Sequence, residues 1–189
     1  MNKLLISTAL LSITSLSALA GHRAETNSTN KIYDVERGFA QTLSISETEQ
    51  IGKFRAVLTT SRTSKKHHSR RGHHQRKRLV LSGVIKGVIN PDFTLNHTFV
   101  NQRRTGALYT ANDTITNIYA GDPTCNYGTG TVPFEVEETL NIVAGTGIYA
   151  NVEPGSTILL KGVINNCPSL PKYGQNTFDV IGGSVTINQ

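Results

Sequence analysis

Long apolar runs are missing from this 189-residue chain after its first 20 residues. A membrane-spanning helix needs about 20 consecutive apolar residues, and no segment after Ala20 offers them. The first 20 residues combine a positive Lys3, an apolar stretch from Leu4 to Leu16 and a small-residue end at Ala20. This pattern is typical of a secretory signal peptide. We therefore expect cleavage after Ala20 and a secreted or periplasmic protein without a transmembrane segment.

Helical periodicity and the common catalytic motifs are missing as well. The chain has no nucleophile elbow, no phosphate-binding loop and no zinc-protease helix motif, so the sequence identifies no reaction. Apolar residues recur at every second position, with Gly, Asn, Asp and Pro between the runs. The pattern predicts a single all-β domain over residues 32–189, after a flexible leader over residues 21–31. An antiparallel β-barrel of about eight strands is the expected architecture, with a β-sandwich as the alternative.

Nine segments carry this alternating pattern. They are residues 39–45, 54–58, 79–89, 93–99, 106–110, 114–119, 131–144, 156–165 and 177–187. In the first two segments, one parity is held by Phe39, Leu43 and Ile45, and by Phe54, Ala56 and Leu58. The segment 131–144 has the longest alternation, which predicts a strand with one apolar face.

Cysteine is scarce, since Cys125 and Cys167 are the two in the chain. An exported protein reaches an oxidising compartment, where an isolated pair most simply forms one disulfide. Closing a loop of this length would stabilise the fold by about 4 kcal/mol in the chain-entropy model. Two unpaired thiols are the alternative.

Acidic and apolar residues are both absent from the segment Arg62–Arg78, which forms a long predicted loop between two strands. Its cations are Arg62, Lys65, Lys66, Arg70, Arg71, Arg76, Lys77 and Arg78, and its histidines are His67, His68, His73 and His74. Without these eight cations and Lys3, ten basic residues remain against 13 acidic ones. The domain is therefore mildly acidic and carries one basic loop.

Clustered Lys and Arg favour a polyanionic partner, such as a glycan, a lipid phosphate or a nucleic acid. Aromatic residues are absent from the loop, which excludes base stacking and argues against sequence readout. The four histidines predict stronger binding as the pH falls through their ordinary pKa of about 6.5. We expect no metal site and no cofactor, because the cations repel a divalent ion and no carboxylate or thiol is nearby. A solvated loop without a partner is the alternative.

Two polar residues interrupt otherwise apolar strand faces: His97 lies between Leu95 and Phe99, and Glu138 lies between Val136 and Leu140. If these faces line a barrel, His97 and Glu138 form a candidate acid–base pair in its interior. The alternatives are a histidine satisfied within the core and a β-bulge that turns Glu138 to solvent.

A short turn motif follows the longest alternating strand. Gly145, Thr146 and Gly147 precede Ile148, Tyr149 and Ala150. This motif resembles the allene oxide cyclase and dirigent barrel superfamily, whose members carry Gly-Thr-Gly before an aromatic and a small residue at a β-turn. The resemblance covers Phe134 to Gly162. It implies an eight-stranded antiparallel barrel with a central cavity, and the catalytic residues of the plant enzymes have no matching positions here.

These observations order three functional hypotheses. The first is non-enzymatic binding of a polyanion by the cationic loop. The second is a cyclase- or isomerase-like function, in which a small apolar ligand is bound or isomerised near His97 and Glu138. The third is an exported protein whose interaction surface lies elsewhere.

Overall fold

The computed structural model describes residues 30–61, 76–125 and 132–188. The expected signal peptide, most of the expected leader and residues 62–75 of the cationic loop lie outside these ranges. Within them the chain is almost entirely β-structure, which confirms the predicted fold class. No helix in these ranges is long and apolar enough to cross a membrane. The elements are β1 (Lys31–Ser44), β2 (Glu49–Thr60), β3 (Arg78–Ile89), β4 (Leu95–Asn101), β5 (Ala107–Thr110), β6 (Thr114–Ala120), β7 (Phe134–Gly145), the 3₁₀ helix η1 (Gly147–Tyr149), β8 (Ser156–Ile164) and β9 (Gln175–Ile187).

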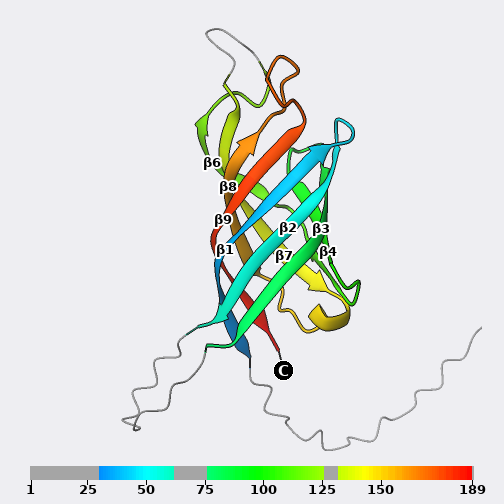
Figure 1. The fold of residues 1–189 in the computed structure, drawn as a ribbon, viewed down its shortest axis with the longest axis vertical. Helices are drawn as coiled ribbons and strands as arrows, with labels where there is room; N and C mark the ends of the chain where they lie inside the picture. Colours follow the sequence, from blue (N-terminus) through cyan, green and yellow to red (C-terminus); the bar gives the residue numbers. More distant parts are fainter. Residues whose placement is uncertain (1–29, 62–75, 126–131, 189) are drawn as a thin grey trace, which may run out of the picture.

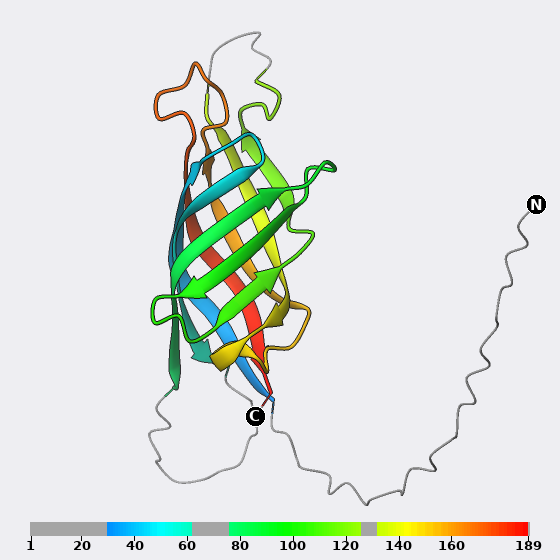
Figure 2. The ribbon, with the colours of Figure 1, turned by 90° about the vertical axis from the view of Figure 1, so that its right-hand side faces the viewer.

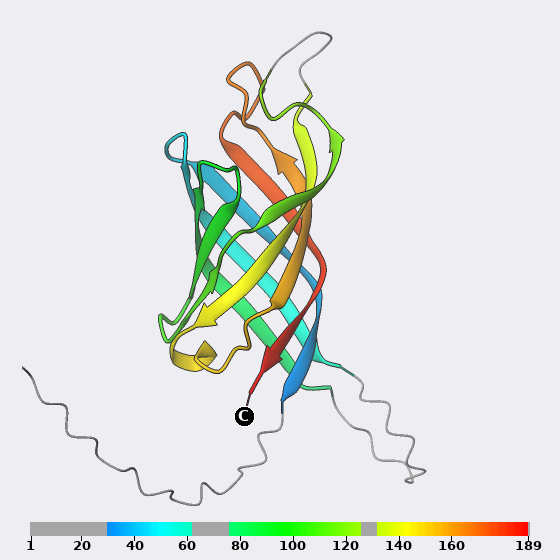
Figure 3. The ribbon, with the colours of Figure 1, turned by 180° about the vertical axis from the view of Figure 1, so that it is seen from behind.

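The strands form one antiparallel sheet that closes on itself. Hydrogen-bonded neighbours follow the order β5, β4, β3, β2, β1, β9, β8, β7 and β6. An additional pairing of β5 with β7 joins the two sides of this sheet. Eight strands therefore form a closed barrel, and β6 is an extra strand that pairs with β7 (Figures 1 and 3). The barrel prediction is confirmed, and the β-sandwich alternative is wrong.

Strand β7 shows why the alternating sequence folds this way. Its alternate residues Phe134, Val136, Glu138, Leu140 and Ile142 are all buried in the barrel. Their neighbours along the strand are more exposed, because successive side chains point to opposite faces of a sheet. The predicted parity of this strand is confirmed, although the strand begins at Phe134 and not at Thr131.

Strand β1 departs from the simple alternation. Leu43 and Ile45 share the parity of Phe39 in the sequence, yet they are 50% and 55% exposed. The register between β1 and β2 shifts between Val35 and Arg37, which marks a bulge or irregularity. Such an extra residue exchanges the inward and outward positions that follow it. The inward residues of β1 are therefore Tyr33 and Val35 before the shift, and Ala40 and Thr42 after it.

The two ends of the barrel differ in what they carry. At one end, the hairpin end, lie the last residue of β2, the first residue of β3, η1 and the last described residues of the chain (Figures 1 and 2). At the other, the disulfide end, lie the turns 45–48 and 90–94 and the connection 165–174. Cys125 follows β6 and forms a disulfide with Cys167, which follows β8. The predicted disulfide is confirmed.

Glycines allow the strands of the barrel to approach closely at several positions. A Cβ atom on Gly83 of β3 would lie 1.9 Å from the carbonyl oxygen of Val100 on β4. This neighbour is backbone in a paired strand, so it cannot move aside without breaking the pairing. By contrast, a Cβ atom on Gly182 of β9 would meet only the end of the Leu159 side chain, at 3.6 Å.

We therefore predict that Gly83→Ala destabilises the barrel by about 2 kcal/mol or more, because over-packing against rigid neighbours has costs of this order. The matched control Gly182→Ala should change the free energy of unfolding by less than about 0.5 kcal/mol. Urea unfolding followed by circular dichroism measures both values. Equal effects of the two substitutions would contradict the argument from strand approach.

Candidate functional site

Polar side chains gather inside the barrel toward the disulfide end. The structure buries ten polar or charged residues in its described part, and eight of them are linked by contacts into one group. We call this group the polar cluster. Its members are Thr42, Gln50, His97, Thr110, Asp113, Glu138, Asn165 and Asn176.

Asp113 lies at the seam where the barrel closes. Strand β7 pairs with β5 at Ile142–Gly145 and with β6 at Glu135–Thr139, so this edge of β7 changes partner near Asn141. There the Asn141 backbone N–H donates to Asp113 Oδ1 at 2.6 Å, and the Asn141 carbonyl oxygen accepts from the Ala111 N–H at 3.1 Å. Asp113 is fully buried, and its own backbone exchanges two hydrogen bonds with Leu95 of β4. The carboxylate thus takes the place of a strand partner.

The second oxygen of Asp113 binds His97. His97 Nδ1 lies 2.7 Å from Asp113 Oδ2, and this same oxygen accepts a hydrogen bond from the Thr110 hydroxyl. Thr110 Oγ1 in turn accepts from the His97 backbone N–H at 2.9 Å. His97 reaches this position because Leu95, His97 and Phe99 alternate inward along β4, as predicted. It is 3% exposed.

Glu138 completes a group of three ionisable side chains. Its Oε1 lies 3.9 Å from His97 Nδ1 and has no hydrogen-bond partner, although the residue is only 3% exposed. One ligand atom from each of His97, Asp113 and Glu138 lies within 4.8 Å of the other two. The predicted pair of His97 and Glu138 therefore faces the barrel interior, and the bulge that would have turned Glu138 to solvent does not occur.

Burial and charge shift the proton affinities of this group. Burial raises the pKa of Glu138 to about 7, with an opposing effect from His97 and a smaller added effect from Asp113. Burial alone would lower the pKa of His97. The hydrogen bond to Asp113 and the charges of Glu138 and Asp113 outweigh it, so the His97 pKa is raised.

The other ring nitrogen of His97 faces Gln50. Thr42 Oγ1 and Asn176 Nδ2 donate to Gln50 Oε1 at 2.6 and 3.1 Å, which turns the Gln50 amide nitrogen toward His97 Nε2 at 3.5 Å. This orientation favours the tautomer in which His97 Nδ1 donates to Asp113 and Nε2 is an acceptor. Gly87 leaves room for the contact, since a Cβ atom there would lie 2.7 Å from the Gln50 side chain.

The structure also places other residues singled out in the sequence. Arg76, Lys77 and Arg78 are exposed at the hairpin end, where Arg76 forms an ion pair with Glu36 at 3.4 Å. Residues 62–75 of the loop, with its four histidines, are outside the described ranges.

Tyr149, from the turn motif, is buried near the hairpin end and not beside His97. Gly145 ends β7, Thr146 Oγ1 accepts the Ala107 N–H at 3.2 Å, and Gly147 adopts a φ of 58°, which favours glycine. Burial raises the pKa of the Tyr149 hydroxyl, and a hydrogen bond from Asn101 opposes this shift.

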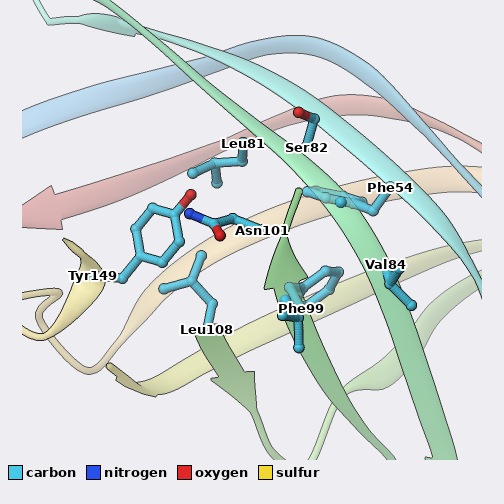
Figure 4. Close-up of a pocket in the computed structure, with 10 residues that line it drawn as sticks. Phe54, Leu81, Ser82, Val84, Phe99, Asn101, Leu108 and Tyr149 are labelled. Carbon is cyan, nitrogen blue, oxygen red and sulfur yellow. The ribbon is translucent and has the colours of Figure 1, made fainter. Parts of the chain in front are cut away.

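A small cavity lies in this apolar half of the barrel (Figure 4). Its volume is about 10 Å³, which corresponds to a single water molecule. Phe99 separates it from His97, as the two rings lie side by side with centroids 6.0 Å apart. The cavity is lined by Phe54, Leu81, Ser82, Gly83, Val84, Phe99, Val100, Asn101, Leu108 and Tyr149.

The fold and the cluster define a closed antiparallel β-barrel with an ionisable group in its interior. No family model, no curated protein and no solved structure matches this chain. Chemically, the group of His97, Asp113 and Glu138 can bind protons or a cation. Sequence reasoning missed Asp113, because an Asp between Asn112 and Thr114 carries the ordinary signal of a turn.

The raised pKa of Glu138 predicts how stability varies with pH. A carboxyl group that holds its proton more tightly in the folded chain stabilises the fold fully below its unfolded pKa, near 4.5. That contribution is lost as the pH rises through about 7, and the raised pKa of His97 acts in the same direction. We therefore expect the free energy of unfolding to fall between about pH 5 and pH 8, by up to about 3 kcal/mol for Glu138.

Glu138→Gln should remove most of this fall and should stabilise the protein at about pH 8, because the amide stays neutral. Glu137→Gln is the matched control, since Glu137 lies on the outer face of the same strand. The measurement is urea unfolding in buffer that contains EDTA, so that protons alone occupy the cluster. An unchanged pH profile in Glu138→Gln would contradict the prediction.

Proposed function

We propose that this protein binds polyanions through the cationic loop Arg62–Arg78. The observation that carries this proposal is the concentration of eight Lys and Arg side chains in one connection of an otherwise mildly acidic chain. Such a cluster attracts phosphate or sulfate groups at long range, and binding releases the counterions of the polymer.

The barrel supports this role through the way it holds both ends of the loop. Strands β2 and β3 are direct neighbours, and their pairing continues to Thr59 and Arg78. Beyond it, the Thr60 N–H donates to the Lys77 carbonyl oxygen at 3.0 Å. The eight cations therefore belong to a single hairpin connection with both stems fixed at one end of a rigid barrel.

The composition of the loop indicates the class of partner. Lys and Arg contact phosphate or sulfate groups along a polymer, whereas base recognition needs stacking or groove readout. The loop contains no aromatic residue. A sulfated glycan, a phosphate-rich surface or a nucleic acid bound through its backbone all satisfy this chemistry, and heparin is a suitable common probe.

The second candidate is a small apolar ligand bound or isomerised inside the barrel. One observation favours it, namely that His97 and Glu138 face the interior at 3.9 Å from each other. The cavity of about 10 Å³ near Phe99 is far smaller than an organic ligand, so the barrel would have to open to admit one. For this reason we place binding by the loop first.

A charge-matched pair of variants tests the loop. Lys65, Lys66, Arg70 and Arg71 are changed to Gln in one variant; in the control, Gln replaces four exposed cations of the barrel, Arg37, Lys53, Arg55 and Arg103. We expect the loop variant to bind heparin roughly tenfold more weakly or worse, with a shallower salt dependence, because it loses several contacts to the polymer. The control should lose much less, although its net charge changes equally. Equal losses would show that only total charge matters and would reject the loop as the site.

The four histidines predict a further pH dependence. Between about pH 7.5 and 5.5 their imidazoles gain charge, so retention on heparin should increase. Replacing His67, His68, His73 and His74 with Asn should abolish the increase while leaving retention at about pH 7.5 intact. Elution salt concentration at the two pH values gives the answer, and a wild-type profile without change would remove these residues from the proposed function.

A further inference from the structure

We propose that His97, Asp113 and Glu138 bind one first-row divalent metal ion, zinc in the first instance, inside the barrel. An imidazole nitrogen and two carboxylate oxygens from three separate segments have ligand atoms within 4.8 Å of one another. This site is independent of the cationic loop and of its proposed partner.

The ligand atoms already lie close to a coordination geometry. In a tetrahedral zinc site, bonds of about 2.0–2.1 Å place ligand atoms about 3.3 Å apart. The two separations from His97 Nδ1, 2.7 Å to Asp113 Oδ2 and 3.9 Å to Glu138 Oε1, bracket this value. A metal ion would replace the hydrogen bond between His97 and Asp113, and the Glu138 carboxylate would close in by several tenths of an ångström.

The unpartnered oxygen of Glu138 is the independent observation that points to a ligand. Glu138 Oε1 is buried without a hydrogen bond, and it faces the pair formed by His97 and Asp113. A buried polar atom without a partner is unfavourable by about 1–3 kcal/mol, and by more when it is charged. A coordinated cation would supply the missing partner.

The charge of the group also favours a cation. Two carboxylates accompany one imidazole, and their hydrogen-bonding neighbours in the described part of the chain are Thr110, Gln50 and backbone N–H groups, which carry no formal charge. A divalent ion would balance the two carboxylates and leave the imidazole neutral, as metal ligation requires.

The donor set indicates the class of metal. One imidazole and two carboxylates suit Zn²⁺, Mn²⁺, Fe²⁺ or Co²⁺ more than Ca²⁺ or Mg²⁺, which prefer all-oxygen ligands. Three protein ligands are also the number found in zinc sites that keep a fourth position for water. Around the ligands, the Asn141 N–H fixes Asp113, and Gln50 faces the outer nitrogen of His97. Coordination through Nδ1 places a proton on Nε2, so the Gln50 amide would turn its oxygen toward His97.

The test uses the full mature chain with His67, His68, His73 and His74 changed to Asn, because these loop histidines would bind metal themselves. In this background, Glu138→Gln removes one proposed ligand, and Glu137→Gln is the control on the outer face. Each protein is unfolded in urea with its disulfide intact and refolded with either EDTA or one equivalent of Zn²⁺, Mn²⁺ or Co²⁺. Refolding lets the ion reach a site that the folded barrel buries.

We expect Zn²⁺ to remain bound at one ion per chain after desalting and to raise the melting temperature by about 5 °C or more. The Glu137→Gln control should behave in the same way, whereas Glu138→Gln should fold but show neither effect. Bound Co²⁺ should also give the visible absorption of a low-symmetry site in the control alone. The proposal is overturned if no ion is retained by the control, or if Glu138→Gln retains it equally. Neither result bears on heparin binding, so the two proposals fail separately.

Discussion

The closure of the barrel depends on a buried carboxylate. Along one edge, β7 changes partner from β6 to β5, and Asp113 supplies the hydrogen bond that a continuous strand would have given to the Asn141 N–H. A buried carboxylate is unfavourable unless its oxygens are satisfied and its charge is compensated. Thr110 and His97 meet this requirement at the second oxygen. The seam of the fold and the ionisable group in its interior are therefore one structural feature.

The two ends of the barrel separate two kinds of chemistry. The hairpin end holds the stems of the cationic loop above an apolar interior that includes Phe54, Phe99 and Tyr149. The disulfide end surrounds the polar cluster, and the bond between Cys125 and Cys167 ties together two of its connections. Because the core between them is closely packed, each end can change its charge without direct contact with the other. A surface function at one end and a buried site at the other are compatible in one small domain.

The sequence was informative wherever period-two alternation was uninterrupted. It predicted the inward parity of β4 and β7, and with it the shared interior position of His97 and Glu138. It failed at β1, because a register shift near Val35 has no signal in the residues themselves. It also missed Asp113, whose role arises only when the bend between β5 and β6 meets β4 and β7 in space. The barrel agrees with the fold implied by the allene oxide cyclase and dirigent resemblance, and common ancestry with that superfamily stays a prediction.

Within the polar cluster, packing and hydrogen bonding account for every ionisable residue except Glu138. Asp113 is required at the seam, and His97 is required by Asp113. Both needs are met before Glu138 is considered, since Asp113 already accepts from Asn141, Thr110 and His97. A Leu or Met at this position would continue the apolar face of Val136 and Leu140 without burying an unpartnered oxygen. Replacing a buried ionic group by an apolar one is often neutral or stabilising, so stability alone does not explain a glutamate here. Its presence is explained by something that binds between it and His97, whether a proton or a metal ion.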